Sequence, residues 1–365
     1  MTRIKDIIHS LEAWAPVSYA ENYDNVGLIA GGSSNEISGV LVSLDCTEAV
    51  VDEAIAKNCN LIVSHHPIVF KGLKRLTGSN YVERTVIKAI KNDIALYAIH
   101  TNLDNIEGGV NKKISDLLGL ESTRILAPKS NRLEKITFFV PKDHAETVRN
   151  ALFKAGGGEI GNYSNCSFNL LGEGTFLPGA DAEPFIGNAG NLQVEAEMRI
   201  EVMYPDYLRR KILEALKDAH PYEEVAYYIH QLENANETIG SGMVGNTTAP
   251  FEPMEFFSHI KQSMKLQVFK HTGICKDAIR SVAVCGGSGS FLLRDAMAAR
   301  ADVFITSDFK YHEFFDAEDK IIIVDIGHYE SERFTIDLIA DFLSKKFSTF
   351  ATHLTGVVTN PIHYF

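Results

Sequence analysis

Two adjacent histidines, His65 and His66, follow an apolar run in the stretch LIVSHHPIVF at residues 61–70. Imidazole nitrogens bind metal ions and carry protons near neutral pH. Successive side chains of a strand point to opposite faces, so both rings can reach one site only where the strand has ended. Pro67 favours such an end, since it holds His66 extended and cannot donate to a sheet. The alternative is that one ring packs in the core and the other lies in water.

Two further histidines are each followed by a carboxylate four residues later. His328 precedes Glu332, and His100 precedes Asp104. On a helix this spacing places both side chains on one face, within reach of the same ion. A solvated helix face would explain a single pair of this kind. The two pairs and the histidines of the first stretch all stand at predicted strand ends, and this coincidence favours a common site.

Imidazoles and carboxylates without thiolates suit zinc, iron, manganese, cobalt or nickel as divalent ions. These candidate ligands outnumber the ligands that a single open catalytic ion takes from a protein. Two ions about 3.5–4 Å apart, bridged by a carboxylate and a water, would use them all. We therefore expect two divalent metal ions at this site.

Other polar residues follow the predicted strand at 302–312, which ends in TSDFKYH. His312 or His100 could carry protons there, and Lys310 could contact an anion, which makes these three the candidate catalytic residues. Alternatively, Asp308, Lys310 and His312 orient the metal ligands instead of meeting a substrate.

Two other motifs have less specific readings. CGGSGS at 285–290 could cradle a phosphate, but it matches neither the dinucleotide nor the P-loop pattern, and a tight turn between strand and helix is the commoner explanation. The cluster HPYEEVAYY holds His220, Tyr222, Glu223 and Glu224, and it could cap a helix, begin a strand or contribute to a subunit contact.

The elements that must position these residues form two similar halves. Predicted strands at 38–45, 60–67 and 94–100 alternate with helices at 47–59 and 81–93, which indicates a parallel sheet. The same order returns at 280–332, and the segments IVSHHP and IHTNLD align with ITSDFK and GHYESE. We interpret this as a weak internal duplication in an α/β fold, with the polar strand ends meeting at one cleft.

A different pattern separates the halves. Six segments between residues 135 and 233 read as strand, helix, strand, strand, helix and strand, which is the ferredoxin-like order. The Gly-rich segment at 240–250 resembles a linker, and the segment at 23–32 is rich in turn residues. We expect an inserted α+β domain at 130–237 and a discontinuous α/β domain at 1–129 and 238–365.

Composition narrows the class of protein. The 365 residues fit two or three domains, and no apolar run approaches the ~20 residues that would span a bilayer. Five scattered cysteines without a C-x-x-C motif argue against disulfides and thiolate zinc sites, and we expect a cytoplasmic protein. With 35 basic and 47 acidic residues, the net charge of −12 makes nucleic acid an improbable partner, although a basic lining that includes KGLKR at 71–75 is conceivable.

Eight segments in the same order resemble one family, the NIF-three-like (NGG-interacting factor three) dinuclear metal-centre proteins, commonly named GTP cyclohydrolase I type 2 homologues. The matching segments span nearly the whole chain: YDNVGL, LIVSHHP, HTNLDN, GNYSNCSF, HPYEEVAY, CGGSGS, ITSDFKYH and GHYESE. The resemblance implies five ligands for two metal ions, with Glu332 as the bridge and His100 as a near neighbour; the five are His65, His66, Asp104, His328 and Glu332.

The resemblance also implies how the protein assembles and which fold the inserted domain has. Members of the family form toroidal homo-oligomers, commonly hexamers, and the longer members carry an inserted domain similar to the PII and CutA folds. The leading expectation for function is a metal-dependent hydrolase of a small substrate, such as the purine ring of a nucleotide. The alternatives are a metal-handling or regulatory protein without turnover, and a ring-shaped nucleic-acid scaffold.

Overall fold

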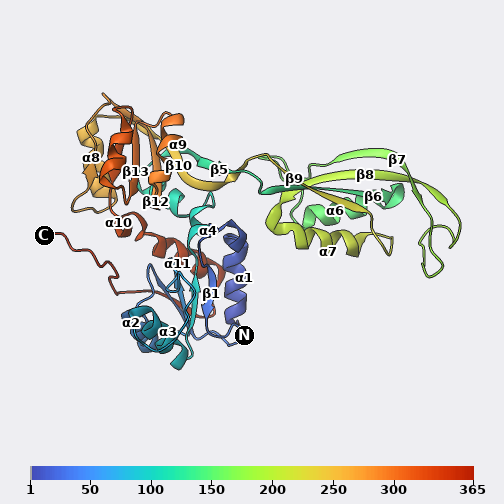
Figure 1. Ribbon diagram of the computed structural model, residues 1–365, viewed down its shortest axis with the longest axis horizontal. Coiled ribbons are helices and arrows are strands. Elements are labelled where there is room, and N and C mark those ends of the chain that lie inside the picture. The colour runs from blue at the N-terminus through green and yellow to red at the C-terminus, as the bar shows by residue number, and fades with distance from the viewer. Residues whose placement is uncertain (1) are drawn as a thin grey trace. The chain divides into compact units, whose positions relative to one another are not determined.

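The computed structural model of the protein describes residues 2–365, which divide into two compact units (Figure 1). Unit 1 comprises residues 2–128 and Glu237–Phe365, and unit 2 comprises Lys129–Asn236. Both units mix helices with sheets. No helix within the described range is long and apolar enough to cross a membrane.

The helices of unit 1 are α1 (Ile4–Trp14), α2 (Glu48–Ala56), α3 (Tyr81–Lys91), α4 (Thr101–Asp104), α5 (Val110–Leu117), α8 (Pro253–Ser263), α9 (Leu293–Ala298), α10 (His328–Glu332) and α11 (Thr335–Lys346). Its 3₁₀ turns are η1 (Val17–Tyr19), η4 (Ser290–Leu292) and η5 (Tyr311–Ala317). Each of these helices packs on, or leads out of, one of two sheets.

The first sheet of unit 1 has the order β1-β4-β3-β2-β15, and the second has the order β11-β14-β13-β12-β10-β5. Strands of the first sheet are β1 (Gly27–Ala30), β2 (Gly39–Ser43), β3 (Leu61–Ser64), β4 (Ala95–Ala98) and β15 (Ala351–Leu354). Strands of the second are β5 (Glu121–Lys129), β10 (Asn236–Phe251), β11 (Lys270–His271), β12 (Ile279–Ser288), β13 (Val303–Ser307) and β14 (Ile322–Asp325).

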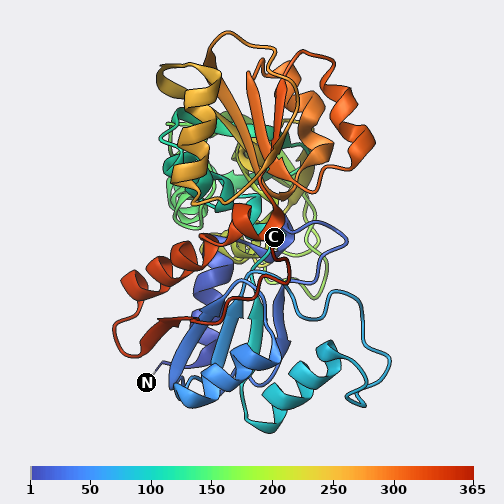
Figure 2. The same cartoon turned by 90° about the vertical axis from the view of Figure 1, so that its left-hand side faces the viewer.

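Each sheet of unit 1 contains a parallel triplet of strands in the same order, β2-β3-β4 in one and β12-β13-β14 in the other (Figure 2). The triplets are parallel because a helix or a 3₁₀ turn crosses over between consecutive strands. Antiparallel strands flank the second triplet on both sides, since β10 pairs with β12 and β11 with β14. The first triplet is flanked by antiparallel β1 beside β4 and by parallel β15 beside β2. The sheets are therefore mixed, with parallel centres.

Apolar side chains on both faces explain why the central strands read as continuous hydrophobic runs. Along β2, Val40 and Val42 join one buried cluster, and Leu41 joins another on the opposite face. The first cluster also takes Val303 and Val324 from the second sheet, so a single core connects the two sheets of unit 1. This shared core fixes the ends of the two sheets relative to each other.

Two expectations about local structure were wrong. The segment at 240–250 is not a linker, because it lies within β10, where Met243 and Val244 pair with Val284 and Ala283 of β12. Its glycines favoured a loop, but Gly240 and Gly242 instead fit beside neighbouring strands where a side chain would collide with Ala127 and Val284 carbonyls. The turn-rich segment at 23–32 likewise includes strand β1.

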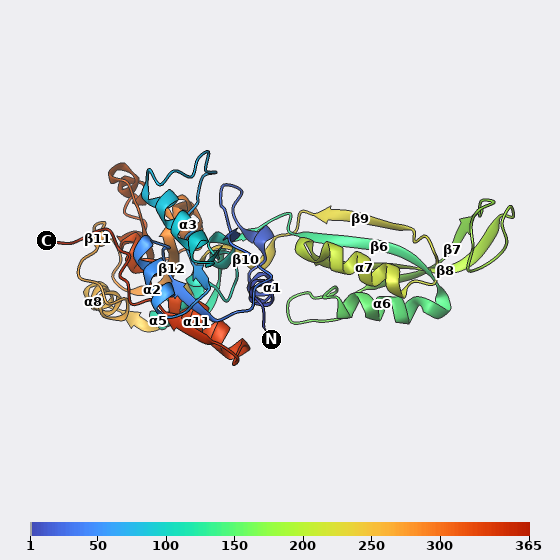
Figure 3. The same cartoon turned by 90° about the horizontal axis from the view of Figure 1, so that it is seen from below.

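Unit 2 has one antiparallel sheet of order β7-β8-β6-β9. Its elements are β6 (Leu133–Pro141), η2 (Lys142–His144), α6 (Ala145–Lys154), β7 (Phe168–Phe176), β8 (Gln193–Pro205), η3 (Asp206–Leu208), α7 (Arg209–Ala219) and β9 (Tyr227–Leu232). Helices α6 and α7 lie on the same face of this sheet (Figure 3), where Val148 and Ile212 pack against Phe138 and Ile200.

Candidate metal centre

The site lies at the carboxyl ends of the parallel strands of unit 1. His65 and His66 follow β3 directly, and His100 follows β4 and precedes α4, which ends at Asp104. In the second sheet, α10 follows β14 and extends from His328 to Glu332. Polar residues that follow three strands of two sheets therefore converge, as expected for the carboxyl ends of parallel strands.

The two adjacent histidines share this site because the chain has left β3 before it reaches them. The His65 N–H donates to the Ser43 carbonyl (3.1 Å), and the His66 N–H donates to the Leu44 carbonyl (2.9 Å). Their ring centroids are 5.0 Å apart with planes tilted by 45°. Both rings face Glu332. The two neighbours therefore reach one site, although successive side chains within a strand would point to opposite faces.

Each of the four imidazoles is held through Nδ1. The partners of Nδ1 are the Ile99 carbonyl for His65 (2.8 Å), Asp45 for His66 (2.8 Å), Asp24 for His100 (2.9 Å) and Asp308 for His328 (2.6 Å). A carbonyl oxygen only accepts, so His65 carries its proton on Nδ1 and leaves the Nε2 lone pair free. Such outer partners orient metal-binding histidines and raise their basicity.

Glu332 lies among these rings and is only 2% exposed. Its Oε2 lies 2.9 Å from His66 Nε2 and 3.1 Å from His328 Nε2, whereas its Oε1 lies 3.7 Å from His65 Nε2. The two oxygens of one carboxylate thus face different histidines. A carboxylate in this arrangement can bridge two cations.

A pair of buried polar atoms beside Glu332 lacks hydrogen-bond partners. His65 Nε2 and Asp104 Oδ1 are both inaccessible to solvent and unsatisfied, and they lie 3.6 Å apart. Leaving such groups unsatisfied destabilises a protein, so this geometry fits a cation held between them. His65, Asp104 and Glu332 form one group that could hold a metal ion, and His66, His328 and Glu332 form another.

A third such group includes His100, together with His65 and His66. The ring of His100 lies edge-on to both, with centroids 5.2 Å away in each case. His100 is also the residue before α4, and its carbonyl accepts the Asp104 N–H (3.1 Å). The same turn therefore positions one imidazole and one carboxylate of the cluster.

The carboxyl groups of the cluster have opposite pKa shifts. Burial and the neighbouring Glu332 raise the pKa of Asp104 well above its usual value. Burial also disfavours charge on Glu332, but the rings of His328 and His66, which lie within hydrogen-bond distance, and the nearby ring of His65 outweigh it and lower the pKa of Glu332 well below its usual value. Two buried carboxylates so close cannot both ionise readily unless a cation lies near them.

The histidines of the cluster also differ in the direction of their pKa shifts. Burial lowers the pKa of His65 to about 4, so this ring is neutral and ready to bind a metal. For His66, burial is outweighed by hydrogen bonds to Asp45 and Glu332, which raise its pKa to about 10. In the same way Glu332 and Asp308 raise the pKa of His328 to about 9 against the effect of burial. A metal ion must displace protons from the last two rings.

Glycine 287 makes room for the central carboxylate. A Cβ at Gly287 would lie 2.4 Å from Glu332 Oε1, and the residue has a φ of +64°. The N–H groups of Gly286 and Gly287 already donate to Asn111 Oδ1 (2.9 Å) and Ser331 Oγ (2.9 Å). These amides are occupied, so the CGGSGS motif forms a wall of the metal centre and its structure does not favour a phosphate cradle.

The C-terminal segment supports the cluster from outside. The Thr359 hydroxyl donates to Asp45 Oδ2 (2.6 Å), whose other oxygen holds His66. The adjacent Asn360 donates to Glu330 on α10 (3.2 Å). This segment therefore contacts both halves of unit 1 beside the site.

Two candidates from the sequence lie apart from the cluster. Lys310 is exposed and its N–H donates to Glu313 (2.9 Å), while the His312 ring contacts Tyr311 and Phe315. Neither belongs to any of the groups among residues 2–365 that could hold a metal ion. Their neighbour Asp308 does reach the cluster, through His328. This contact matches the orienting alternative for Asp308.

Sequence reasoning missed Asp24, Asp45 and Thr359. Asp45 lies two residues after the end of β2, so the strand-end rule that selected the histidines could have found it. Asp24 belongs to the YDNVGL segment, where an aspartate before asparagine resembles an ordinary turn. No local signal marks Thr359, which lies far from the other residues in the sequence.

We expect Gly287→Ala to damage the centre more than a matched glycine elsewhere. Gly119 has a similar φ of +67° but open space around its Cβ position, so Gly119→Ala reports the backbone strain alone, about 1–2 kcal/mol. Gly287→Ala adds a collision with Glu332. Chemical denaturation, followed by the fluorescence of Trp14, the single tryptophan, would measure the stability of each variant. Elemental analysis would measure the metal that each variant binds. Equal losses of stability and equal metal contents in the two variants would contradict this role.

Metal binding to the metal-free protein should release protons. His66 and His328 are protonated at neutral pH because their pKa values are raised, and a cation competes with those protons. For each proton released, the affinity should rise about tenfold per pH unit. Titration calorimetry with Mn²⁺ at about pH 6 and pH 8, in buffers of different ionisation enthalpy, measures both effects. An affinity independent of pH would contradict them.

Comparison with known proteins assigns the chain to a family. The model of the Duf34/NIF3 (NGG1p interacting factor 3) family matches residues 2–361. A relative from Halalkalibacterium halodurans is 41% identical over 324 residues, covering 88% of this chain and 87% of that protein. One from Bacillus subtilis is 38% identical over 327 residues, covering 89% and 88%. Both carry the name GTP cyclohydrolase 1 type 2 homolog.

Solved structures agree with this assignment. A Bacillus cereus protein related to NIF3 has a TM-score of 0.87 and 38% identity, and the match covers 100% of this chain and 99% of that one. The Staphylococcus aureus protein SA1388 has a TM-score of 0.78 and 29% identity, with the same coverage of both chains. The chain therefore belongs to the Duf34/NIF3 family, as its motifs indicated.

Proposed function

We propose that the protein binds two divalent metal ions at this centre and uses them to hydrolyse a small substrate. The observation that carries the proposal is the position of the Glu332 carboxylate, whose two oxygens face different histidines. One ion would take His65, Asp104 and Glu332, and the other would take His66, His328 and Glu332. Glu332 is then the bridge, and the orphaned atoms of His65 and Asp104 gain a partner.

Divalent ions bound here would supply Lewis acidity and make a water molecule a nucleophile at neutral pH. Around them, the residues of the chain set the geometry. Asp45 and Asp308 hold the rings of His66 and His328 so that Nε2 points inward. The Ile99 carbonyl does the same for His65. Fixed rings lower the entropy that is lost when a ligand binds.

His100 is the best-placed residue for moving a proton. Its Nδ1 is held by Asp24, whose own side chain is fully buried, and the imidazole is 15% exposed. Burial opposes charge on Asp24, but hydrogen bonds with His100 and Thr101 lower the pKa of Asp24 to about 2. Because Nδ1 is held by Asp24, Nε2 is the His100 nitrogen left to accept a proton from water or give one to a leaving group. Lys310 and His312 remain secondary candidates.

The names of the relatives direct the choice of substrate. Proteins that share 38–41% of their residues with this chain are called GTP cyclohydrolase 1 type 2 homologs, so purine nucleotides are the first substrates to test. We further propose that unit 2 is an inserted ferredoxin-like domain. The strand and helix order β6-α6-β7-β8-α7-β9 and the sheet order β7-β8-β6-β9 support this.

Metal-loaded protein should turn over a member of a nucleotide panel that includes GTP. The variant His65→Ala/Glu332→Ala removes a ligand from each proposed ion and should lose more than the roughly 10–100-fold that loss of an outer partner causes. A matched variant, His271→Ala/Glu255→Ala, removes the same residue types from exposed positions outside the cluster and should keep full activity.

Equal rates in the two double variants would contradict the hydrolase. Absence of turnover across the panel, with metal bound and freely exchangeable, would instead indicate a metal-handling protein. Elemental analysis of protein purified without chelator or affinity metal identifies the native ion in either case.

A further inference from the structure

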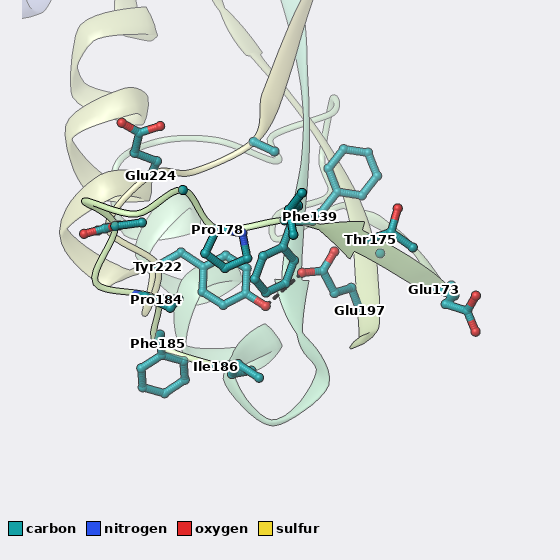
Figure 4. Close-up of a pocket in the computed structure, with 18 of the residues that line it drawn as sticks. Phe139, Glu173, Thr175, Pro178, Pro184, Phe185, Ile186, Glu197, Tyr222 and Glu224 are labelled. Atoms are coloured by element: carbon teal, nitrogen blue, oxygen red, sulfur yellow. Dashed lines mark hydrogen bonds between the residues drawn. The ribbon is translucent and has the colours of Figure 1, made fainter. Parts of the chain in front are cut away.

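Unit 2 contains a large pocket that the metal centre does not use. The pocket has a volume of about 1020 Å³, at the upper end of the range for small-molecule sites. Figure 4 shows it between the ends of the sheet strands, the loop that carries Pro178, Pro184 and Phe185, and the loop that carries Tyr222 and Glu224. All its lining residues lie in unit 2.

Aromatic rings form much of the wall. The ring centroids of Phe176 and Tyr222 are 5.8 Å apart. The ring of Phe139 lies edge-on to that of Tyr228, with centroids also 5.8 Å apart. Phe185, on the loop over the pocket, lies 6.3 Å from Tyr222. Aromatic faces attract methylene groups through burial and attract cations through their quadrupoles.

A buried carboxylate without a cation lies in this wall. Glu197 is 8% exposed, and the one hydrogen bond of its carboxylate among the described residues comes from the neutral Tyr222 hydroxyl (3.0 Å), drawn in Figure 4. Gly174 accommodates the acid, because a Cβ there would lie 2.1 Å from Glu197 Oε2. None of the ion pairs in the part of the chain that the structure describes involves Glu197. A buried charge without a countercharge is destabilising, so a cationic ligand would relieve it.

The remaining charges of the pocket have the same sign. Four further acids line it: Glu173, Asp181, Glu223 and Glu224. The basic residue of the lining, Arg199, is already paired with Glu201 (2.6 Å) outside it. The acids do not cluster as metal ligands do, since none of the metal-binding groups found in residues 2–365 includes a residue of this pocket. Scattered carboxylates between aromatic surfaces suit several ammonium groups spaced by methylene chains.

We propose that this pocket binds an aliphatic polyamine. One ammonium group pairs with Glu197 beside the Tyr222 ring, and others reach Glu224 or Glu173 at the two ends of the pocket, which Figure 4 places on opposite sides of Glu197. The methylene chain lies against Phe139, Phe176 and Phe185. The site is independent of the proposed hydrolase, because no lining residue belongs to the metal centre.

Titration calorimetry of the full chain with spermidine, at about 0.15 M ionic strength, tests the proposal. Glu197→Gln keeps the shape of the side chain and removes its charge, and it should weaken binding at least about tenfold. Glu224→Gln, at an exposed position on the rim, should weaken binding severalfold without affecting the fold. The control Glu146→Gln, an exposed position on α6 outside the pocket, should bind as the unchanged protein does.

Three results would overturn the proposal. The first is that spermidine does not bind at millimolar concentration. This holds even if a lysine-rich peptide binds instead. The second is equal affinity in Glu197→Gln, Glu224→Gln and the Glu146→Gln control. The third is displacement of spermidine by Mg²⁺ at equal concentration, which would indicate an inorganic cation site. Metal content and thermal unfolding of each variant show whether unit 1 and the fold are intact.

Discussion

The carboxylate of Glu332 is buried at the meeting point of two sheets, and much of unit 1 is arranged around it. Burial alone would keep this group neutral, but the imidazoles of His66 and His328 lie within hydrogen-bond distance of it and, with His65 close by, hold it charged. Gly287 leaves the space that it fills, and α10 carries it at the end of a strand in the second sheet. The histidines that face it come mainly from the first sheet. Neither half of unit 1 could form this site by itself.

The surrounding acids give the centre its rigidity. Asp24, Asp45 and Asp308 each hold one imidazole through Nδ1, and Thr359 holds Asp45 in turn. These contacts fix which nitrogen is available and where it points, before any cation binds. Every ring has an outer acceptor and an inward nitrogen, an order that suits a group able to hold a metal ion.

Period and position in the sequence selected residues that the structure brings together. His-x-x-x-carboxylate spacing and predicted strand ends brought together His100, Asp104, His328 and Glu332, and the turn after β3 accounts for His65 and His66. These signals are local, so the sequence alone carries them. The family assignment, which eight motifs indicated, is confirmed by the family match and by relatives over most of the chain.

What escaped prediction depends on contacts between distant parts of the chain. Thr359 and Asp45 are far apart in sequence, and nothing near either residue indicates their hydrogen bond. The glycines of β10 favoured a linker because their pattern lacks the usual apolar alternation, yet close packing against neighbouring strands requires them. The unpaired charge of Glu197 was also invisible, since it depends on a pocket that three separate segments form.

Anomalous diffraction from crystals grown with Mn²⁺ tests the central claim most directly. The account predicts two peaks about 3.5–4 Å apart, with the Glu332 carboxylate between them, one beside His65 and Asp104 and the other beside His66 and His328. No peak among these residues, or a single peak that Glu332 does not contact, would contradict the dinuclear centre.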